Sequence, residues 1–145
     1  AQGEAGTVSE VPVISTDFYP TLLEMAGLPA MPGQAVDGVS LVPALTGKPF
    51  ARKPIFWHFP QYSNHGMQSP GGAVRAGDYK LLEYYENNTV QLFNLRDDIG
   101  EQNDLSQAEP DKVAELRTML HTWRNEVSAQ MPPPNPDYAP GNYPE

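Results

Sequence analysis

Two histidines and a tyrosine form the most suggestive chemical cluster in this sequence. His58 lies in an aromatic run, and Tyr62 and His65 follow it in a polar, glycine-containing stretch. Imidazole can exchange a proton or donate to a bound anion near neutral pH, so these side chains could contact a substrate. The alternative is that a backbone hydrogen bond holds His58 and that His65 is an ordinary loop residue. The residues alone favour this alternative, because ordinary environments explain most histidines.

Arg75 is a further candidate for binding an anionic substrate. It lies in the run Ala73-Val-Arg-Ala-Gly-Asp-Tyr-Lys80. The guanidinium could contact an anion near a pocket, or it could form a bidentate pair with a carboxylate such as Asp78 or Asp98 and so tie a strand to a loop. The second interpretation is favoured.

Four carboxylates lie close together further along the chain. Calcium prefers several carboxylate oxygens, but this run lacks the alternating ligands and the closing glutamate of an EF-hand. A solvated acidic loop is therefore favoured over a metal site, and no catalytic or metal-ligating residue is predicted. The four carboxylates belong to Asp97, Asp98, Glu101 and Asp104.

Composition limits the classes of protein that fit. The 145 residues suit a modest core, and 16 prolines and 12 glycines imply long irregular connections. A formal charge of −9 with scattered basic residues argues against a nucleic-acid partner, and no apolar run approaches the length of a membrane span. With no basic and apolar leader and no initiator methionine, the chain is expected to be a fragment or a truncated product.

An N-terminal strand–helix unit is expected near the start of the chain. The apolar run of residues 11–14 reads as a strand that leads into a helix capped by Ser15 or Thr16. Asp17 places a carboxylate at the positive end of the helix dipole, and Gly27 supplies the left-handed stop. The helix carries an apolar stripe that needs a partner: Leu22, Leu23, Met25 and Ala26.

The middle of the chain predicts about four antiparallel strands. Residues 54–59, 72–75, 79–86 and 89–95 are rich in β-branched, aromatic and alternating apolar residues. The intervening Asn87-Asn88 has the form of a two-residue type I′ hairpin loop.

A long amphipathic helix follows the acidic loop. Ser106 and Glu109 offer a capping box, and Pro110 fits the first turn. Its apolar stripe consists of Val113, Leu116, Leu120, Trp123 and Val127. The charged residues Arg117, Arg124 and Glu126 are expected away from that stripe. The fold class is therefore α+β: a small antiparallel sheet of about four strands, packed by a long C-terminal helix.

Five segments, in this order, resemble the C-terminal portion of type I sulfatases, which are formylglycine- and calcium-dependent hydrolases of the alkaline phosphatase superfamily. They are Val13-Ile-Ser-Thr-Asp-Phe-Tyr-Pro-Thr-Leu-Leu-Glu-Met-Ala-Gly-Leu28, Asp37-Gly-Val-Ser-Leu-Val-Pro-Ala-Leu-Thr-Gly47, Phe56-Trp-His-Phe-Pro-Gln-Tyr62, Ala73-Val-Arg-Ala-Gly-Asp-Tyr-Lys-Leu-Leu82 and Leu92-Phe-Asn-Leu-Arg-Asp-Asp-Ile-Gly-Glu-Gln-Asn-Asp-Leu105. The resemblance implies that residues 1–48 end the α/β catalytic domain and its linker. Residues 49–130 would form the C-terminal subdomain, and residues 131–145 an extended proline-rich tail.

The resemblance also implies which part of the parent enzyme carries out the chemistry. The parent sulfatase would hydrolyse sulfate esters, with sulfated sugars as the expected substrates, and its formylglycine and calcium would lie upstream of this chain. The chain itself has no cysteine and no Ser-x-Pro-x-Arg sequence, so it lacks the formylglycine motif. It is expected to support the catalytic domain and to line the substrate pocket with His58, Tyr62, His65 and Arg75, without catalysing alone. A periplasmic or secreted parent is implied.

Two alternatives remain open at this point. The chain could be a free-standing sulfatase-like binding module, although its negative charge disfavours sulfated glycans as ligands. It could also belong to a related phosphate or phosphonate ester hydrolase. The expected partner is the missing catalytic domain, and the uncovered apolar surface also predicts a homo-oligomer of the isolated chain.

Overall fold

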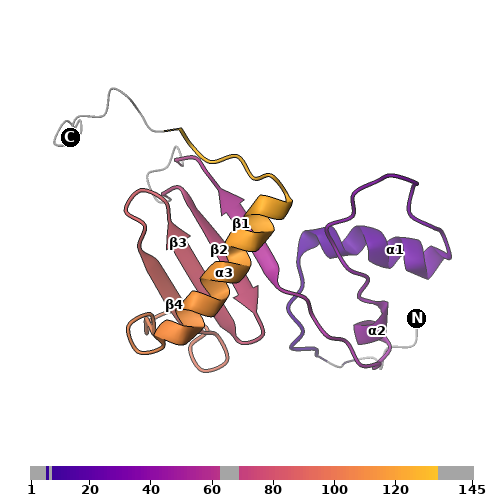
Figure 1. The fold of residues 1–145 in the computed structure, drawn as a ribbon. Helices are drawn as coiled ribbons and strands as arrows, with labels where there is room; N and C mark the ends of the chain where they lie inside the picture. Colours follow the sequence, from indigo (N-terminus) through magenta and orange to yellow (C-terminus); the bar gives the residue numbers. More distant parts are fainter. Residues whose placement is uncertain (1–5, 7, 63–68, 134–145) are drawn as a thin grey trace. The chain divides into compact units, whose positions relative to one another are not determined.

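The computed structural model describes residue 6 and residues 8–62 and 69–133. It divides the chain into two compact units, Ala1–Lys53 and Pro54–Glu145 (Figure 1). The first unit is mainly helical and irregular, whereas the second contains the sheet and the long helix.

The first unit contains the 3-10 turn η1 (Ser15–Asp17) and the helices α1 (Phe18–Ala26) and α2 (Val42–Leu45). The helix α1 ends at Gly27 as predicted, with a left-handed φ of 67°. Its N-cap is Asp17 rather than Ser15 or Thr16. The expected strand at residues 11–14 is not formed among the described residues of this unit, although Ile14 is extended.

The carboxylate of Asp17 joins two distant segments of the first unit. It is fully buried, it accepts the backbone N–H of Ile14 at 2.9 Å and of Val39 at 3.0 Å, and it pairs with Arg52 at 2.9 Å. Burial favours the neutral acid, but the two N–H donors and Arg52 together hold the pKa of Asp17 below its usual value. The buried group is therefore an ion, and the unit depends on its partners.

Gly38 allows the close approach that brings Val39 to Asp17. A Cβ built on Gly38 would lie 2.1 Å from the backbone oxygen of Thr16, and a contact that short requires the backbone to move. The Asp-Gly-Val-Ser-Leu segment therefore needs glycine at this point for a packing reason.

We expect Gly38→Ala to destabilise the first unit by about 2 kcal/mol, because the added methyl group overpacks a backbone contact. This corresponds to roughly thirtyfold more of the locally open state, measured as faster proteolytic cleavage within residues 36–53. Gly100→Ala is the matched control, since its Cβ would make only an ordinary 3.6 Å contact. Equal cleavage rates for Gly38→Ala and the wild type would contradict the expectation.

Most of the predicted apolar stripe of α1 is exposed, and only Leu23 is half-buried. Phe18, Leu22 and Met25, which are spaced for one helix face, are exposed by 61%, 63% and 53%. An apolar face of this kind normally marks a contact surface.

The second unit is a four-stranded antiparallel meander with the strand order β1-β2-β3-β4. The strands are β1 (Ile55–Phe59), β2 (Gly71–Ala76), β3 (Tyr79–Tyr84) and β4 (Val90–Asn94), and helix α3 (Pro110–Glu126) lies across one face of the sheet (Figure 1). Both the sheet and the covering helix agree with the predicted fold class. The core between them consists of Val74, Leu81, Leu92, Leu116 and Leu120.

Two local predictions in this unit are wrong. The β3–β4 connection runs from Tyr85 to Thr89, and of the Asn pair only Asn88 has a positive φ, whereas a type I′ turn needs two such residues. The helix α3 begins at Pro110 with Glu109 as N-cap, and no side chain caps it, so the expected capping box is not formed.

Most of the expected proline-rich tail, residues 134–145, lies outside the described residues. Among the helices that the structure describes, none has the length and apolarity needed to cross a membrane.

Candidate functional site

His58 lies on the α3 side of the sheet, and both its ring nitrogens are engaged. Nε2 is 2.8 Å from the carbonyl oxygen of Gln130, which can only accept, so Nε2 carries the proton. Nδ1 is 2.7 Å from the hydroxyl of Tyr85 and accepts from it in the neutral ring. Burial raises the pKa of Tyr85 despite the opposing effect of Arg124, so the hydroxyl keeps its proton. His58 therefore holds the strand end to the segment after α3.

The other members of the predicted histidine cluster follow β1. The Tyr62 hydroxyl lies 2.5 Å from a carboxylate oxygen of Glu86 and donates to it. His65 lies outside the described residues. The assignment of His58, Tyr62 and His65 to substrate binding stays a prediction.

Arg75 does not form the carboxylate pair that the sequence favoured. Asp78 pairs instead with Arg96 at 2.6 Å, because the turn that holds Asp78 adjoins the end of β4. Asp98 accepts the backbone N–H groups of Gln102 and Asn103, both at 2.8 Å. Strand alternation places Arg75 on the opposite sheet face from His58, so the two predicted site residues are not brought together.

The acidic loop uses its carboxylates to hold its own backbone and to tie the loop to β3 and β4. Asp104 accepts the N–H groups of Leu92 and Ser106, and Glu101 pairs with Lys80 at 2.6 Å. Among the described residues, no group of three or more histidine, cysteine, aspartate or glutamate side chains is placed to hold a metal ion.

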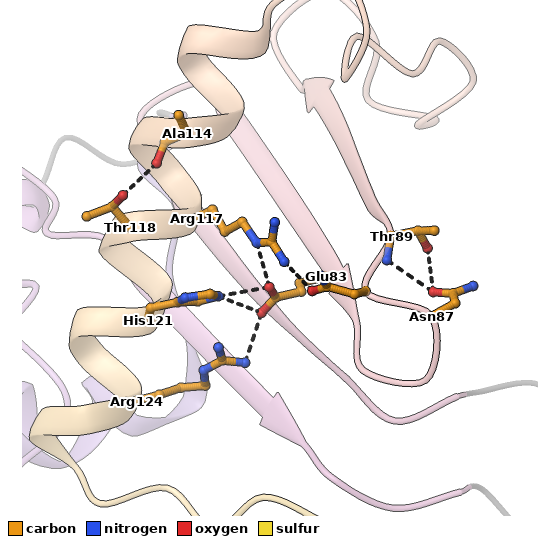
Figure 2. Close-up of polar contacts among 9 residues, drawn as sticks. Glu83, Asn87, Thr89, Ala114, Arg117, Thr118, His121 and Arg124 are labelled. Atoms are coloured by element: carbon orange, nitrogen blue, oxygen red, sulfur yellow. Dashed lines mark hydrogen bonds and ion pairs between the residues drawn. The ribbon is translucent and has the colours of Figure 1, made fainter.

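The sequence analysis missed the main polar cluster of the second unit. Glu83 is only 3% exposed and faces α3, where it is met by three cationic or ionisable side chains (Figure 2). Arg117 Nε donates at 2.8 Å, Arg124 donates at 2.9 Å, and His121 Nε2 lies 2.8 Å from the same carboxylate. Arg117 also reaches Asn88 beyond β3. The cluster therefore fixes the helix on the sheet.

The electrostatic balance of this cluster favours an ionised glutamate. Burial would raise the pKa of Glu83, but the hydrogen bonds from His121 and Arg117 and the charge of Arg124 outweigh it and hold the pKa below its usual value. Arg124 also lies over the ring of Tyr85 at 5.2 Å, so the cluster reaches the residue that holds His58.

A trough of about 300 Å³ lies on the sheet face opposite α3. Trp57 and Phe59 of β1 form one wall, and Leu82 and Tyr84 of β3 form the other. The trough is mostly apolar, and Ser69 and Glu83 complete its lining. The small residues of its floor are Gly71, Gly72 and Ala73.

Comparison with known proteins agrees with this architecture. Residues 2–130 match the family described as N-sulphoglucosamine sulphohydrolase, C-terminal. A sulfatase of Formosa agariphila is 36% identical over 81% of this chain and 23% of its own length. A Delta 4,5-hexuronate-2-O-sulfatase of Bacteroides thetaiotaomicron is 33% identical over 63% of this chain and 19% of its own length.

Solved structures show the same fold. A structure described as a 2-O GAG sulfatase superimposes with a TM-score of 0.65 at 26% identity, over 78% of this chain and 25% of that one. A protein solved in complex with its substrate D-glucosamine-2-N,6-O-disulfate gives a TM-score of 0.63 at 24% identity, over 77% of this chain and 24% of that one. The chain thus spans about a quarter of the length of these relatives. With its sheet, its covering helix and this match over residues 2–130, the chain belongs to the N-sulphoglucosamine sulphohydrolase C-terminal family and is a sulfatase C-terminal domain.

Proposed function

We propose that this chain is the C-terminal part of a sulfatase that hydrolyses sulfate esters of sugars. In this role it supports the catalytic domain and lines one wall of the substrate pocket. The family match over residues 2–130, which covers only about a quarter of the matched relatives, is the observation that carries the proposal. The names of two relatives, a hexuronate-2-O-sulfatase and an N-acetylglucosamine-6-O-sulfatase, support sulfated sugars as the substrate class.

The chemistry of such a parent would be supplied upstream of this chain. Sulfatases use a formylglycine nucleophile and a metal ion, and the sequence here contains no cysteine and no Ser-x-Pro-x-Arg motif from which formylglycine could be made. Calcium and formylglycine are therefore assigned to the remaining part of the parent, which we propose to be periplasmic or secreted.

The pocket wall is proposed to come from the end of β1 and the segment after it. His58 would act there as a positioning residue, because both its nitrogens are bound within the chain. Tyr62 and His65 are proposed to contribute to the same wall. Arg75 lies on the other sheet face from His58.

We expect the 145-residue chain by itself not to hydrolyse an aryl sulfate, with or without added calcium, because it lacks the nucleophile. Release of the phenol product above a buffer control would contradict this expectation. The coding sequence upstream of Ala1 gives the complementary test. A Cys/Ser-x-Pro-x-Arg motif there supports a sulfatase parent, and a start codon next to Ala1 would overturn it.

A further inference from the structure

The sheet face opposite α3 contains a trough that the described chain leaves open. On β2, Ala73 pairs in register with Trp57 and Leu82, and Gly71 pairs with Phe59 and Tyr84. Small residues on the middle strand thus lie between large ones on both neighbouring strands. The side chains of Trp57 and Phe59 remain 41% and 38% exposed.

The floor of the trough cannot be filled from within the sheet. A Cβ on Gly71 would lie 2.8 Å from the backbone oxygen of Glu83, so a side chain at this position would displace the neighbouring strand. The hollow is therefore a fixed feature of the sheet, and its apolar walls are available to a partner.

Arg75 lies on the same face of the sheet as the trough, at the next position of β2 that points to that side. Its side chain has no hydrogen-bond acceptor in the described part of the chain. It lies two residues beyond Ala73, about 7 Å further along the strand and on the same side. In the described part of the chain, the Nε atoms of Arg75 and Arg52 are both shut off from solvent without a hydrogen bond, but Arg52 and the other three arginines each form an ion pair, which Arg75 does not. A buried guanidinium donor left unpaired is strongly unfavourable, so this position calls for an acceptor from elsewhere.

The chemistry of this face favours a protein partner over a sulfated glycan. Aromatic and aliphatic walls beside a half-buried arginine resemble the centre of a protein–protein interface, where aromatic residues and arginine are enriched. The chain carries a net charge of −9, which repels a polyanionic glycan. The relatives that it matches are about four times longer, so the rest of a sulfatase is the partner whose size and chemistry fit.

We propose that this open face receives the catalytic part of the parent sulfatase. Apolar side chains of that part would fill the trough, and one of its carboxylate or carbonyl oxygens would accept from Arg75. This inference rests on the proposed function and adds to it the surface on which the two parts meet.

The test compares the 145-residue chain with the full product of the gene that encodes it. Hydroxyl-radical footprinting read by mass spectrometry should show severalfold slower modification of Trp57 and Phe59 in the full product. His121, which lies on the α3 side of the sheet, is the control, and its rate of modification should be similar in the two proteins.

A substitution at Arg75 gives a second, independent measurement. Arg75→Met keeps the aliphatic length and removes the unpaired charge, so the melting temperature of the 145-residue chain should stay the same or rise. In the full product the same change removes a guanidinium that is hydrogen-bonded to the catalytic part, and the melting temperature should fall by several degrees. Arg96→Met, at an exposed pair, is the matched control and should have a small effect in both proteins.

The outcomes separate the two proposals. A gene without an upstream sulfatase region overturns both the proposed function and this docking surface. If that region is present but Trp57 and Phe59 stay equally accessible, or Arg75→Met lowers both melting temperatures equally, only the docking surface is wrong. Protection of Trp57 in the short chain by a heparin disaccharide, or by raising the protein concentration, would replace the proposed partner with a glycan or a second copy.

Discussion

Replacing Glu83 with glutamine is expected to lower the free energy of unfolding by about 3 kcal/mol. The change leaves Arg117 and Arg124 facing a neutral amide in a site where the carboxylate is only 3% exposed, and removing one member of a buried ion cluster is strongly destabilising. Urea unfolding followed by circular dichroism measures the effect as a lower denaturation midpoint.

Glu115→Gln is the matched control for this substitution. Glu115 pairs with Lys112 on the exposed side of the same helix, and an exposed pair of this spacing contributes roughly 0.5 kcal/mol or less. Equal shifts in the denaturation midpoint for the two variants would show that the Glu83 cluster does not fix α3 on the sheet.

The same cluster gives the stability a definite dependence on pH. Since the pKa of Glu83 is lower in the folded chain than its ordinary value of 4.5, its contribution is fully present above that value. It is lost as the pH falls from 4.5 through the lower folded pKa. Glu83→Gln should therefore flatten the acid side of the stability profile. Asp17 and Asp104, whose pKa values are also lowered, should preserve part of the slope.

Asp17→Ala is expected to lower the free energy of local opening of the first unit by about 3 kcal/mol. It removes the acceptor of two backbone N–H groups and leaves Arg52, itself largely buried, without its partner. Hydrogen exchange at the Val39 amide should accelerate by roughly a hundredfold, because that amide loses its acceptor and the segment around Gly38 is released.

Asp37→Ala supplies the control for the first unit, since this neighbouring carboxylate is exposed to solvent. It should leave the exchange rate of the Val39 amide within a factor of about two. If both variants accelerate exchange equally, the effect comes from the segment in general rather than from the buried carboxylate.

The elements that the sequence predicted correctly are those whose signal is local and repeated. Alternating apolar residues indicated the strands, and the apolar stripe through Leu116 and Leu120 indicated α3 and its buried face. The local signal for a two-residue hairpin loop failed because tertiary contacts override it. At the β3–β4 connection, Tyr85 donates its backbone N–H to Pro70 and its hydroxyl to His58, which draws it away from a tight hairpin.

The Glu83 cluster was not predicted because its members are far apart in the sequence. One signal was nevertheless available: Glu83 shares the inward side of β3 with Leu81, and a charge at a core position needs partners. Arg117, His121 and Arg124 follow the spacing i, i+4, i+7 and so share one helix face, beside the apolar stripe. Only the packing of α3 on the sheet shows that this row meets Glu83.

Because Glu83 and its partners are far apart in the sequence, the ribosome makes the carboxylate well before the side chains that neutralise it. The carboxylate precedes Arg117 by 34 residues and Arg124 by 41, so at about 5–20 residues per second Glu83 is made roughly 2–8 seconds before its counter-charges. During that interval the nascent meander exposes Val74, Leu81 and Leu92 together with an uncompensated glutamate. A chain terminated before α3 would keep that surface permanently, and it is therefore expected to be captured by chaperones or to aggregate.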